Sequence, residues 1–292
     1  MAQYLNGKEV AEAVLADVKK RVEYLQSKGK STGLGTILVG DDPASAGYVR
    51  KKHETCELVG IKSYNINVLS SATQKELLNA VKEFNANEDV DSYIIQYPVP
   101  QQFDYNSSLI AMDPEKDADG LHPVNLGKLV LQEDGPRPCT PAGIMAILKH
   151  FNITINCKNV VIVGRGPTLG RPLSLLLSMK HSDANAIVTV VHSALKDISP
   201  YTKKADILIS AVGIPFVIKP EMVKAGAVVI SGGISWQGKK LLPDVDESVE
   251  TVASWITPRL GGVGPTTVAM LLKNTVEASE KSFKKQKEKS GG

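Results

Sequence analysis

The sequence predicts an α/β protein of two domains, built on mostly parallel sheets that are covered by helices. Amphipathic helical segments alternate with short apolar segments along almost the whole chain, and this alternation is typical of β–α–β units. The 292 residues suffice for about two domains. A proline-rich stretch, PRPCTPAG at 136–143, interrupts the alternation and marks the expected boundary between the domains.

The N-terminal half contains three predicted helices and three predicted strands. The helices are expected at 8–28, 43–59 and 73–86, and the strands at 34–40, 61–68 and 90–97. The second helix has the clearest end signals. Asp42 is its expected N-cap, Pro43 takes its first position, and Gly60 follows its last turn.

The C-terminal half is expected to begin with a helix at 143–151. Its apolar segments predict five strands, at 159–163, 186–191, 206–211, 226–230 and 254–257, with helices between most of them. The last periodic segment, 266–281, follows the glycine turn GGVGP. From its pattern alone, this helix could cap the second sheet or return to the first domain.

Composition excludes several classes of function. Lys and Arg total 34 and Asp and Glu total 31, a net charge of +3 that gives no case for nucleic-acid binding. The N-terminal segment has helical apolar spacing and no continuous apolar core, so neither a secretory signal nor a membrane span is expected. The three cysteines suit a reducing compartment, and a cytoplasmic location is therefore expected.

No metal or serine chemistry is expected either. The five histidines show no H-E-x-x-H spacing and no pairing with cysteine at ligand spacing. No G-x-S-x-G turn occurs.

A glycine-rich turn indicates a dinucleotide site. The apolar strand 159–163 leads into Gly164, Gly166 and Gly170, and a helix follows. Glycines let the backbone approach a pyrophosphate, and the helix N-terminus offers unpaired N–H groups. The spacing G-x-G-x-x-x-G is one residue longer than the usual fingerprint, and an ordinary strand-to-helix turn remains the alternative.

The next strand favours NADP over NAD. An NAD site usually has an acidic residue at the end of that strand, whereas here the strand ends in His192 and Ser193. Asp183 lies at nearly the distance from the glycine turn that is expected for this acidic residue, but it precedes the strand instead of ending it. Arg165 in the turn and a hydroxyl at the strand end suit a 2′-phosphate better than a bare ribose.

The first domain offers three candidates for substrate chemistry. Tyr48 and Lys52 lie four residues apart and share a helix face; burial could lower the pKa of such a lysine for proton transfer. Gln96 lies near the carboxyl end of a strand, where parallel sheets bind ligands. Each candidate has a purely structural alternative. Lys52 could belong to a solvated basic helix face, and Gln96 could simply be the residue at which the chain leaves the sheet.

The third candidate is the acidic loop PEKDADGLHPVN, 114–125, with Asp117, Asp119 and Gly120. A calcium loop fits poorly, because the third acidic position and the closing glutamate are missing. A carboxylate that accepts hydrogen bonds from the amino and ring N–H groups of a ligand is the better hypothesis.

Together these stretches resemble the bifunctional methylenetetrahydrofolate dehydrogenase/methenyltetrahydrofolate cyclohydrolases of one-carbon metabolism. The resemblance runs from LNGKEVAEAV near the start to GGVGPTTVAMLLKNTVE near the end. Its strongest parts are SAGYVRKKHETCELVGI, YIIQYPVP, PEKDADGLHPVNLGKL, PCTPAGI, VVIVGRGPTLGRPLSLLL and ITPRLGGVGPTTVAML.

The resemblance implies catalytic roles for four residues. Lys52 matches the catalytic lysine of the S-x-x-Y-x-x-x-K motif, in which Ser45 and Tyr48 also occupy their positions. The tyrosine stacks on the pterin in this family, and Gln96 matches the glutamine that holds the lysine. Asp119 matches the aspartate that binds the pterin edge.

The resemblance also implies cofactor contacts. Gly164, Arg165 and Gly166 belong to the turn that contacts NADP. Ser193 matches the position associated with the 2′-phosphate, and Ile234 matches the isoleucine that ends the G-A-V-V-I-D-V-G-I motif.

The family plan implies a folate-binding catalytic domain over 1–141 plus 266–292 and a Rossmann-like NADP-binding domain over 142–265. The last helix then returns to the first domain, the cleft lies between the domains, and a homodimer forms through the second one. The implied substrates are tetrahydrofolate derivatives, with polyglutamylated forms as further candidates. Methylenetetrahydrofolate is oxidised with NADP to the methenyl compound, which is hydrolysed to 10-formyltetrahydrofolate.

Several positions depart from the commonest family pattern. Gly166 replaces a frequent serine, Ser231-Gly232 replaces Asp-Val, Pro243 replaces a glycine, and Arg259-Leu260 replaces Val-Pro or Asn-Pro. These departures concern the cofactor side more than the catalytic lysine. Two alternatives therefore stay open: another NADP-dependent two-domain dehydrogenase of the shikimate type, and a non-catalytic ligand-binding homologue.

Overall fold

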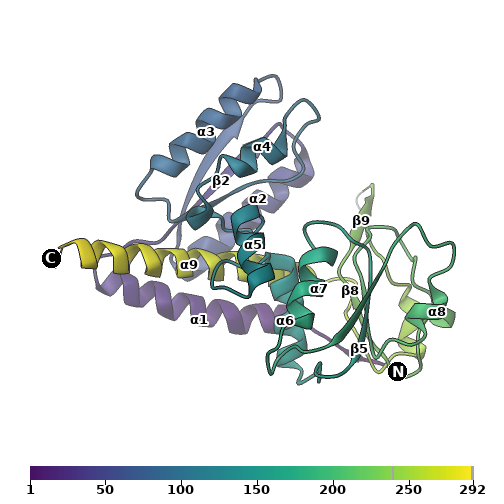
Figure 1. Cartoon of the computed structure of the whole chain (residues 1–292). Helices are drawn as coiled ribbons and strands as arrows, with labels where there is room; N and C mark the ends of the chain where they lie inside the picture. Colours follow the sequence, from purple (N-terminus) through teal and green to yellow (C-terminus); the bar gives the residue numbers. More distant parts are fainter. Residues whose placement is uncertain (239, 291–292) are drawn as a thin grey trace. The chain divides into compact units, whose positions relative to one another are not determined.

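The computed structural model describes residues 1–238 and 240–290 and divides into two compact units (Figure 1). The six-stranded unit comprises Met1–Glu12, Leu129–Glu133 and Pro138–Thr267. The three-stranded unit comprises Ala13–Lys128, Asp134–Arg137 and the chain from Val268 onward. The units are named here after their parallel sheets.

The three-stranded unit has a parallel sheet in the order β3-β2-β4. Its strands are β2 (Gly33–Val39), β3 (Lys62–Val68) and β4 (Ser92–Ile95). The helices between or after them are α2 (Pro43–Val59), α3 (Gln74–Ala86), α4 (Tyr105–Ile110), the 3-10 turn η1 (Pro114–Lys116) and α5 (Pro123–Leu131). The central strand β2 is buried along its whole length, as expected for a strand covered on both faces.

The predicted ends of α2 are confirmed. A carboxylate oxygen of Asp42 accepts a hydrogen bond from the backbone N–H of Ser45 at 2.8 Å, the usual role of an N-cap. Gly60 ends the helix with φ of 80°, a left-handed conformation that glycine adopts without steric cost. These two caps fix where the helix that carries Tyr48 and Lys52 begins and ends.

Helices α1 (Gly7–Ser27) and α9 (Val263–Ser290) run side by side (Figure 1). Arg21 of α1 donates to both carboxylate oxygens of Glu280 of α9, at 2.9 and 2.7 Å. The side chain of Asn274 in α9 donates to the carbonyl of Ala118 at 2.8 Å. The predicted return of the last helix to the first domain is thereby confirmed.

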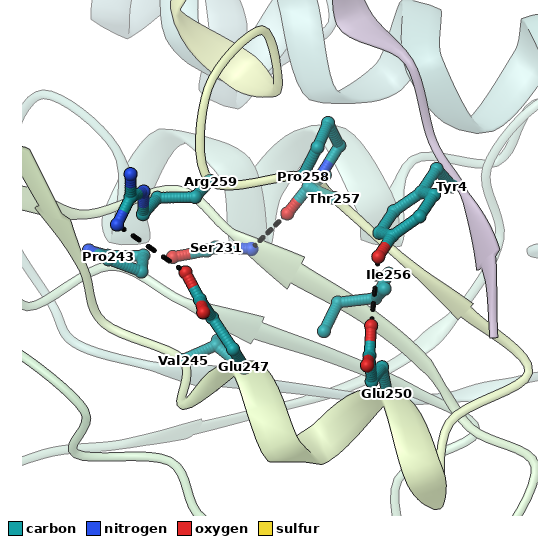
Figure 2. Close-up of a pocket in the computed structure, with 10 residues that line it drawn as sticks. All are labelled: Tyr4, Ser231, Pro243, Val245, Glu247, Glu250, Ile256, Thr257, Pro258 and Arg259. Atoms are coloured by element: carbon teal, nitrogen blue, oxygen red, sulfur yellow. Dashed lines mark hydrogen bonds and ion pairs between the residues drawn. The ribbon is translucent and has the colours of Figure 1, made fainter. Parts of the chain in front are cut away.

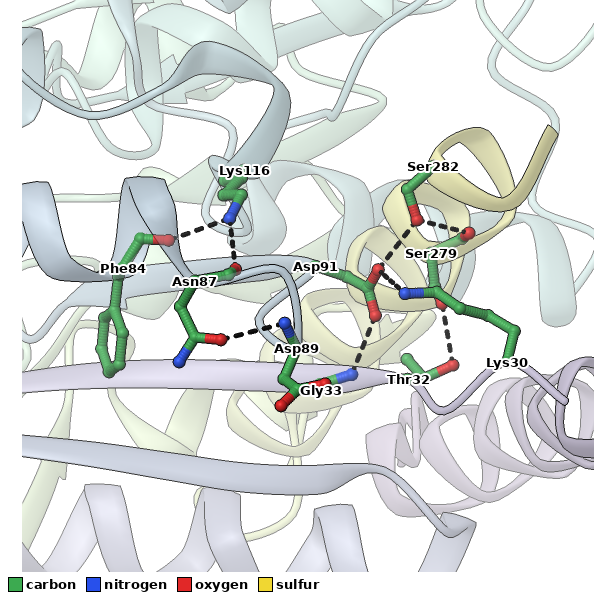
Figure 3. Close-up of polar contacts among 10 residues, drawn as sticks. All are labelled: Lys30, Thr32, Gly33, Phe84, Asn87, Asp89, Asp91, Lys116, Ser279 and Ser282. Carbon is green, nitrogen blue, oxygen red and sulfur yellow. Dashed lines mark hydrogen bonds and ion pairs between the residues drawn. The ribbon is translucent and has the colours of Figure 1, made fainter. Parts of the chain in front are cut away.

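A buried polar cluster also attaches α9 to the start of the sheet (Figure 3). The side chain of Asp91 is 1% exposed and pairs with the ammonium of Lys30 at 2.7 Å. It also accepts hydrogen bonds from the backbone N–H of Gly33 and from the hydroxyl of Ser282, each at 2.9 Å. Because Asp91 satisfies three donors from two segments, the start of β2 and helix α9, it ties these two elements together.

The six-stranded unit has an entirely parallel sheet in the order β1-β11-β8-β7-β5-β6. Its strands are β1 (Gln3–Tyr4), β5 (Asn159–Val163), β6 (Ile187–Val191), β7 (Ile207–Ser210), β8 (Val228–Ser231) and β11 (Trp255–Ile256). Its further elements are α6 (Cys139–His150), α7 (Gly170–Ser178), α8 (Ser199–Thr202), the 3-10 turns η2 (Pro220–Met222) and η3 (Glu247–Thr251), and an antiparallel hairpin of β9 (Ile234–Gln237) and β10 (Lys240–Pro243).

The two faces of this sheet carry separate apolar clusters. Val160 and Ile162 of β5 pack in one cluster with Ile144 of α6 and Leu173 of α7. Val161 and Val163 of the same strand pack in the other cluster. The alternation follows from the two-residue period of a strand, and burial on both faces explains the continuous apolar sequence of β5.

The predicted α/β class, the two parallel sheets and the five strands of the second half are confirmed. Several details differ. Strand β1, helices α4 and α5 and the hairpin β9–β10 were not predicted. Helix α6 begins at Cys139 rather than at 143, and α9 spans Val263–Ser290 rather than 266–281. Within the part of the chain that the structure describes, no helix is long and apolar enough to cross a membrane.

Candidate active site

In the three-stranded unit, the structure joins Lys52 to Gln96. Lys52 Nζ donates a hydrogen bond to Gln96 Oε1 at 3.0 Å. Gln96 directly follows β4 and is 9% exposed, and its backbone N–H continues the sheet ladder to Ile37 at 2.9 Å. The predicted position of Gln96 at the carboxyl end of a strand is therefore correct.

The orientation of the Gln96 amide is set by its other end. Gln96 Nε2 donates to the carbonyl oxygen of Tyr97 at 2.7 Å, so the amide oxygen is the end that faces Lys52. An amide oxygen accepts hydrogen bonds and cannot donate one. Gln96 therefore holds the lysine nitrogen in place in either protonation state without transferring a proton to it.

Helix α2 presents the other residues of the lysine motif. Ser45 is buried and belongs to the N-terminal turn, whereas the side chain of Tyr48 is 39% exposed. Tyr48 lies one turn before Lys52 in α2, so the two side chains share a helix face. The ring of Tyr48 is accordingly open to a planar ligand.

Two neighbours of Lys52 on α2, His53 and Cys56, have shifted pKa values. Burial, assisted by the positive charge of Lys52, lowers the pKa of His53 against the opposing effect of Glu57. Burial also raises the pKa of the Cys56 thiol to about 12, although a hydrogen bond with Ser63 and the charge of Lys52 oppose this shift. Cys56 is fully buried, whereas Lys52 and His53 are half-buried.

Asp117 organises the acidic loop. Asp117 is 3% exposed, and its carboxylate accepts from the backbone N–H groups of Gly120 at 2.9 Å and His122 at 2.8 Å. It also accepts from the side-chain amide of Asn125 at 2.9 Å. With both oxygens engaged inside the loop, Asp117 shapes the backbone that carries the half-buried Asp119.

An aromatic pair connects the start of α4 with the end of β4. The rings of Tyr97 and Tyr105 lie 5.1 Å apart in an edge-to-face arrangement. Burial raises the pKa of Tyr105 above its usual range, and the charges of Asp119 and Asp117 add to this effect. Asp119, Tyr105 and Tyr97 therefore belong to one neighbourhood beside Gln96.

In the six-stranded unit, the glycine turn has the geometry of a close backbone approach. Gly164 has φ of 116°, and a Cβ at this position would overlap the carbonyl group of Ala211. A Cβ at Gly170 would likewise overlap the carbonyl of Gly164. Two of the three glycines are therefore required by the fold, whereas a side chain at Gly166 would meet nothing within 4 Å.

The predicted contacts for a 2′-phosphate lie on neighbouring strands. The backbone N–H of Gly164 donates to the carbonyl of Val191 at 2.8 Å, which places the turn beside the end of β6. Arg165 and Ser193, which follow β5 and β6, are both exposed. Asp183 instead pairs with Lys149 at 2.6 Å in the loop before β6, so it is not at the strand end.

Ile234 lies on the other side of the glycine turn. It opens β9 directly after the segment that follows β8, and its side chain is 42% exposed. In the sheet order β8-β7-β5-β6, the five predicted cofactor residues follow the carboxyl ends of three strands, β8, β5 and β6. Ligands of open parallel sheets bind at this edge, and the cradle around Gly164 fits a dinucleotide.

Three departures from the family pattern line one pocket of about 350 Å³ (Figure 2). These residues are Ser231, Pro243 and Arg259. The polar groups of the pocket pair with one another: Arg259 with Glu247 at 3.6 Å, Tyr4 with Glu250 at 2.8 Å, and Ser231 N with Thr257 Oγ1 at 2.9 Å. The departures are therefore accommodated within the six-stranded unit.

Within residues 1–238 and 240–290, no group of three or more His, Cys, Asp or Glu side chains could hold a metal ion. The fold and the two sets of residues define an α/β enzyme with one dinucleotide-binding unit and a second unit that carries a lysine beside a strand end. Family models match both parts of the chain. Residues 138–283 match the tetrahydrofolate dehydrogenase/cyclohydrolase NAD(P)-binding domain, and residues 5–119 match the catalytic domain of the same family.

The chain belongs to the tetrahydrofolate dehydrogenase/cyclohydrolase family. It is 66% identical over 279 residues to the bifunctional protein FolD of Syntrophotalea carbinolica, covering 96% of each chain. The FolD crystal structure from Campylobacter jejuni matches with a TM-score of 0.92 at 39% identity, over 96% of this chain and 99% of that one. The Trypanosoma brucei enzyme, solved with NADP and an inhibitor, matches with a TM-score of 0.90 at 36% identity, over 97% and 98% of the two chains.

This membership confirms the predicted family, the predicted enzyme with dehydrogenase and cyclohydrolase activities, and the predicted nicotinamide dinucleotide cofactor. The roles of the individual site residues stay predictions. Sequence analysis did not single out Tyr97 or Tyr105, and it did not assign the loop-shaping role to Asp117. Tyr97 could have been identified because it follows Gln96 in the YIIQYPVP motif. No motif in the neighbouring sequence points to Tyr105.

Replacing Gly164 with alanine should weaken dinucleotide binding and lower the free energy of unfolding by about 1–2 kcal/mol, because a Cβ is disfavoured at positive φ and would overlap Ala211. Isothermal titration with NADP and urea unfolding measure the two effects. Gly166→Ala is the matched control for stability, since its Cβ has free space. Equal stability of the two variants would contradict the steric account.

Proposed function

We propose that Lys52 is the proton-transferring residue of both activities and that Gln96 holds it in position. The hydrogen bond of 3.0 Å between Lys52 Nζ and Gln96 Oε1 carries this proposal. A neutral lysine amine can donate one N–H to Gln96 and still present its lone pair to a substrate proton or a water. Lys52 would return that proton when the folate ring opens.

Asp119 and Tyr48 are proposed to bind the pterin. A carboxylate can accept hydrogen bonds from the amino and ring N–H groups of a pterin, and Asp117 fixes the loop that presents Asp119. The exposed ring of Tyr48 offers a stacking surface one turn from Lys52. This arrangement would direct the one-carbon group of the folate toward the lysine nitrogen.

NADP is the proposed cofactor, held by Gly164, Arg165, Gly166, Ser193 and Ile234. When bound, it supplies the two-electron oxidation of the methylene carbon. The NADP-bound relative from Trypanosoma brucei supports the choice, as do the exposed guanidinium and hydroxyl at the ends of β5 and β6. Gly164 lets the turn pack closely on Ala211 at the carboxyl ends of the strands, where the pyrophosphate would lie, and the protein contributes binding and orientation.

An assay of the purified chain tests the proposal. Methylenetetrahydrofolate should be oxidised with NADP, and the methenyl compound should be hydrolysed to 10-formyltetrahydrofolate without any cofactor. Hydrolysis without oxidation would contradict the proposed cofactor site. Oxidation without hydrolysis would contradict the proposed role of Lys52 in the second step.

Replacing Arg165 with alanine should weaken NADP by about tenfold, equal to about 1.4 kcal/mol, and should change NAD binding much less. A guanidinium binds a phosphate through several N–H groups, and only NADP carries the 2′-phosphate. Titration of both dinucleotides measures the difference. Arg171→Ala, which removes another exposed arginine of the same turn and helix, is the matched control; equal losses for the two dinucleotides would disprove the phosphate contact.

The proposal extends to domain limits and cellular setting. Residues 1–141 plus 266–292 would form the folate-binding domain and 142–265 the NADP-binding domain. The family models follow one another in this order, at 5–119 and 138–283, and the second one extends into the last helix. The compact units differ from these limits chiefly at residues 1–12 and 129–133, which belong to the six-stranded unit. We further propose a cytoplasmic homodimer that acts on folates, polyglutamylated forms included. Sedimentation would test the dimer.

A further inference from the structure

Asp244 is a buried acidic residue to which no catalytic or cofactor role has been given. It directly follows β10, and its side chain is 0% exposed. Its carboxyl oxygen Oδ2 accepts hydrogen bonds from the hydroxyl of Ser210 at 2.8 Å and from the backbone N–H of Val212 at 2.9 Å. Both donors belong to the carboxyl end of β7 and the segment that follows it.

The same residue also holds the segment after β8. The backbone N–H of Asp244 donates to the hydroxyl oxygen of Ser231 at 3.2 Å and to the carbonyl of Gly233 at 3.4 Å. A Cβ at Gly233 would overlap the carboxyl group of Asp244, so the two residues are in close contact. Asp244 thus joins two segments that leave adjacent strands.

These two segments border the cofactor residues. A Cβ at Gly164 would overlap the carbonyl of Ala211 and lie 3.1 Å from the Val212 side chain, so the glycine turn packs directly on the segment held by Oδ2. Ile234 follows Gly233 in the chain. A displacement of Asp244 would therefore reach both Gly164 and Ile234 through a single intervening residue.

The carboxyl group is poorly suited to a purely stabilising role. Its other oxygen, Oδ1, is buried and receives no hydrogen bond from the residues that the structure describes. A buried acceptor without a donor lowers stability, and an apolar side chain would avoid that cost. Such exceptions are concentrated at functional sites.

We infer that Asp244 is a positioning residue of the dinucleotide site, which fixes the segments after β7 and β8 against the glycine turn. The inference rests on the proposed cofactor residues Gly164 and Ile234. It assigns Asp244 no contact with substrate or cofactor. Its effect is exerted through Val212 on one side and Gly233 on the other.

Asp244→Ala tests the inference by direct titration of NADP, alongside methenyl hydrolysis measured without cofactor. We expect the Kd for NADP to rise by about tenfold or more, which corresponds to about 1.4 kcal/mol. Hydrolysis should stay within about twofold of the original chain, because it depends on residues of the three-stranded unit. Asp246→Asn is the matched control: it removes an acidic group two residues away that caps η3, and both readouts should be retained.

Two milder variants keep the inference testable if Asp244→Ala does not fold. Asp244→Asn retains an acceptor for Ser210 and Val212 and should recover most of the NADP affinity relative to alanine. Ser210→Ala removes a single donor and should weaken NADP by about threefold while leaving hydrolysis intact. Unchanged NADP affinity in Asp244→Ala, or in Ser210→Ala where the alanine variant does not fold, would overturn the inference.

A parallel loss of NADP affinity and hydrolysis in the Asp244 variants would also overturn it, because general destabilisation would then explain the effect. Failure of the proposed function gives a different result. In that case the original chain itself would not bind NADP, before any substitution is made.

Discussion

Lys52→Met should reduce the rate of methenyl hydrolysis by about 10²–10⁴-fold, the usual contribution of a positioned acid–base group. Methionine retains an unbranched apolar side chain but lacks the nitrogen that bonds to Gln96. Titration should show unchanged NADP binding, because Lys52 belongs to the other compact unit. Stopped-flow absorbance of the methenyl compound measures the rate.

The matched control for this variant is Lys51→Met. Lys51 is exposed on the same helix, one residue before Lys52, so the substitution removes the same charge without touching Gln96. It should retain most of the hydrolysis rate. Undiminished hydrolysis in Lys52→Met would exclude the lysine from the mechanism, and an equal loss in both variants would point to net charge rather than to proton transfer.

Asp91→Ala should lower the free energy of unfolding by about 3–5 kcal/mol, the cost of leaving one member of a buried ion pair alone. The Lys30 side chain is 10% exposed and would lose its carboxylate, while Gly33 N–H and the Ser282 hydroxyl would lose their acceptor. Urea unfolding followed by far-ultraviolet circular dichroism measures the change.

Asp89→Ala provides the comparison for Asp91. Asp89 is exposed and lies two residues earlier in the same turn, where surface charges contribute about 0–1 kcal/mol. The two variants should therefore differ by several-fold in their effect on stability. Similar midpoints would show that the cluster in Figure 3 contributes little to the fold.

The sequence predicted correctly those elements whose ends are determined by neighbouring residues in the chain. Asp42, Pro43 and Gly60 gave both ends of α2 correctly, because capping depends on residues within one turn. Strand β1 escaped prediction because its two residues are too few to show an alternation. The hairpin β9–β10 escaped because its strands are four residues each and follow a glycine pair that ends β8.

The candidate site was predictable to the extent that its residues lie in short motifs. Lys52 and Gln96 are 44 positions apart, and their pairing was expected only from the family resemblance, since no local pattern links a helix face to a strand end. Tyr105 and Asp244 depend on contacts between distant segments. Their surroundings are set by the sheet order, which single-sequence patterns do not specify.

Because β1 pairs with β11, the dinucleotide-binding unit is built from separate stretches of the sequence, including one at the N-terminus and one that begins at residue 138. The backbone of Gln3 and Leu5 bonds to Ser254 and Ile256 at 2.8 and 2.9 Å, and Leu5 is fully buried in that unit. A fragment that starts at residue 138 would leave β11 as an open edge, which invites aggregation. Recombination between relatives that exchanges this region would have to transfer the first dozen codons with it.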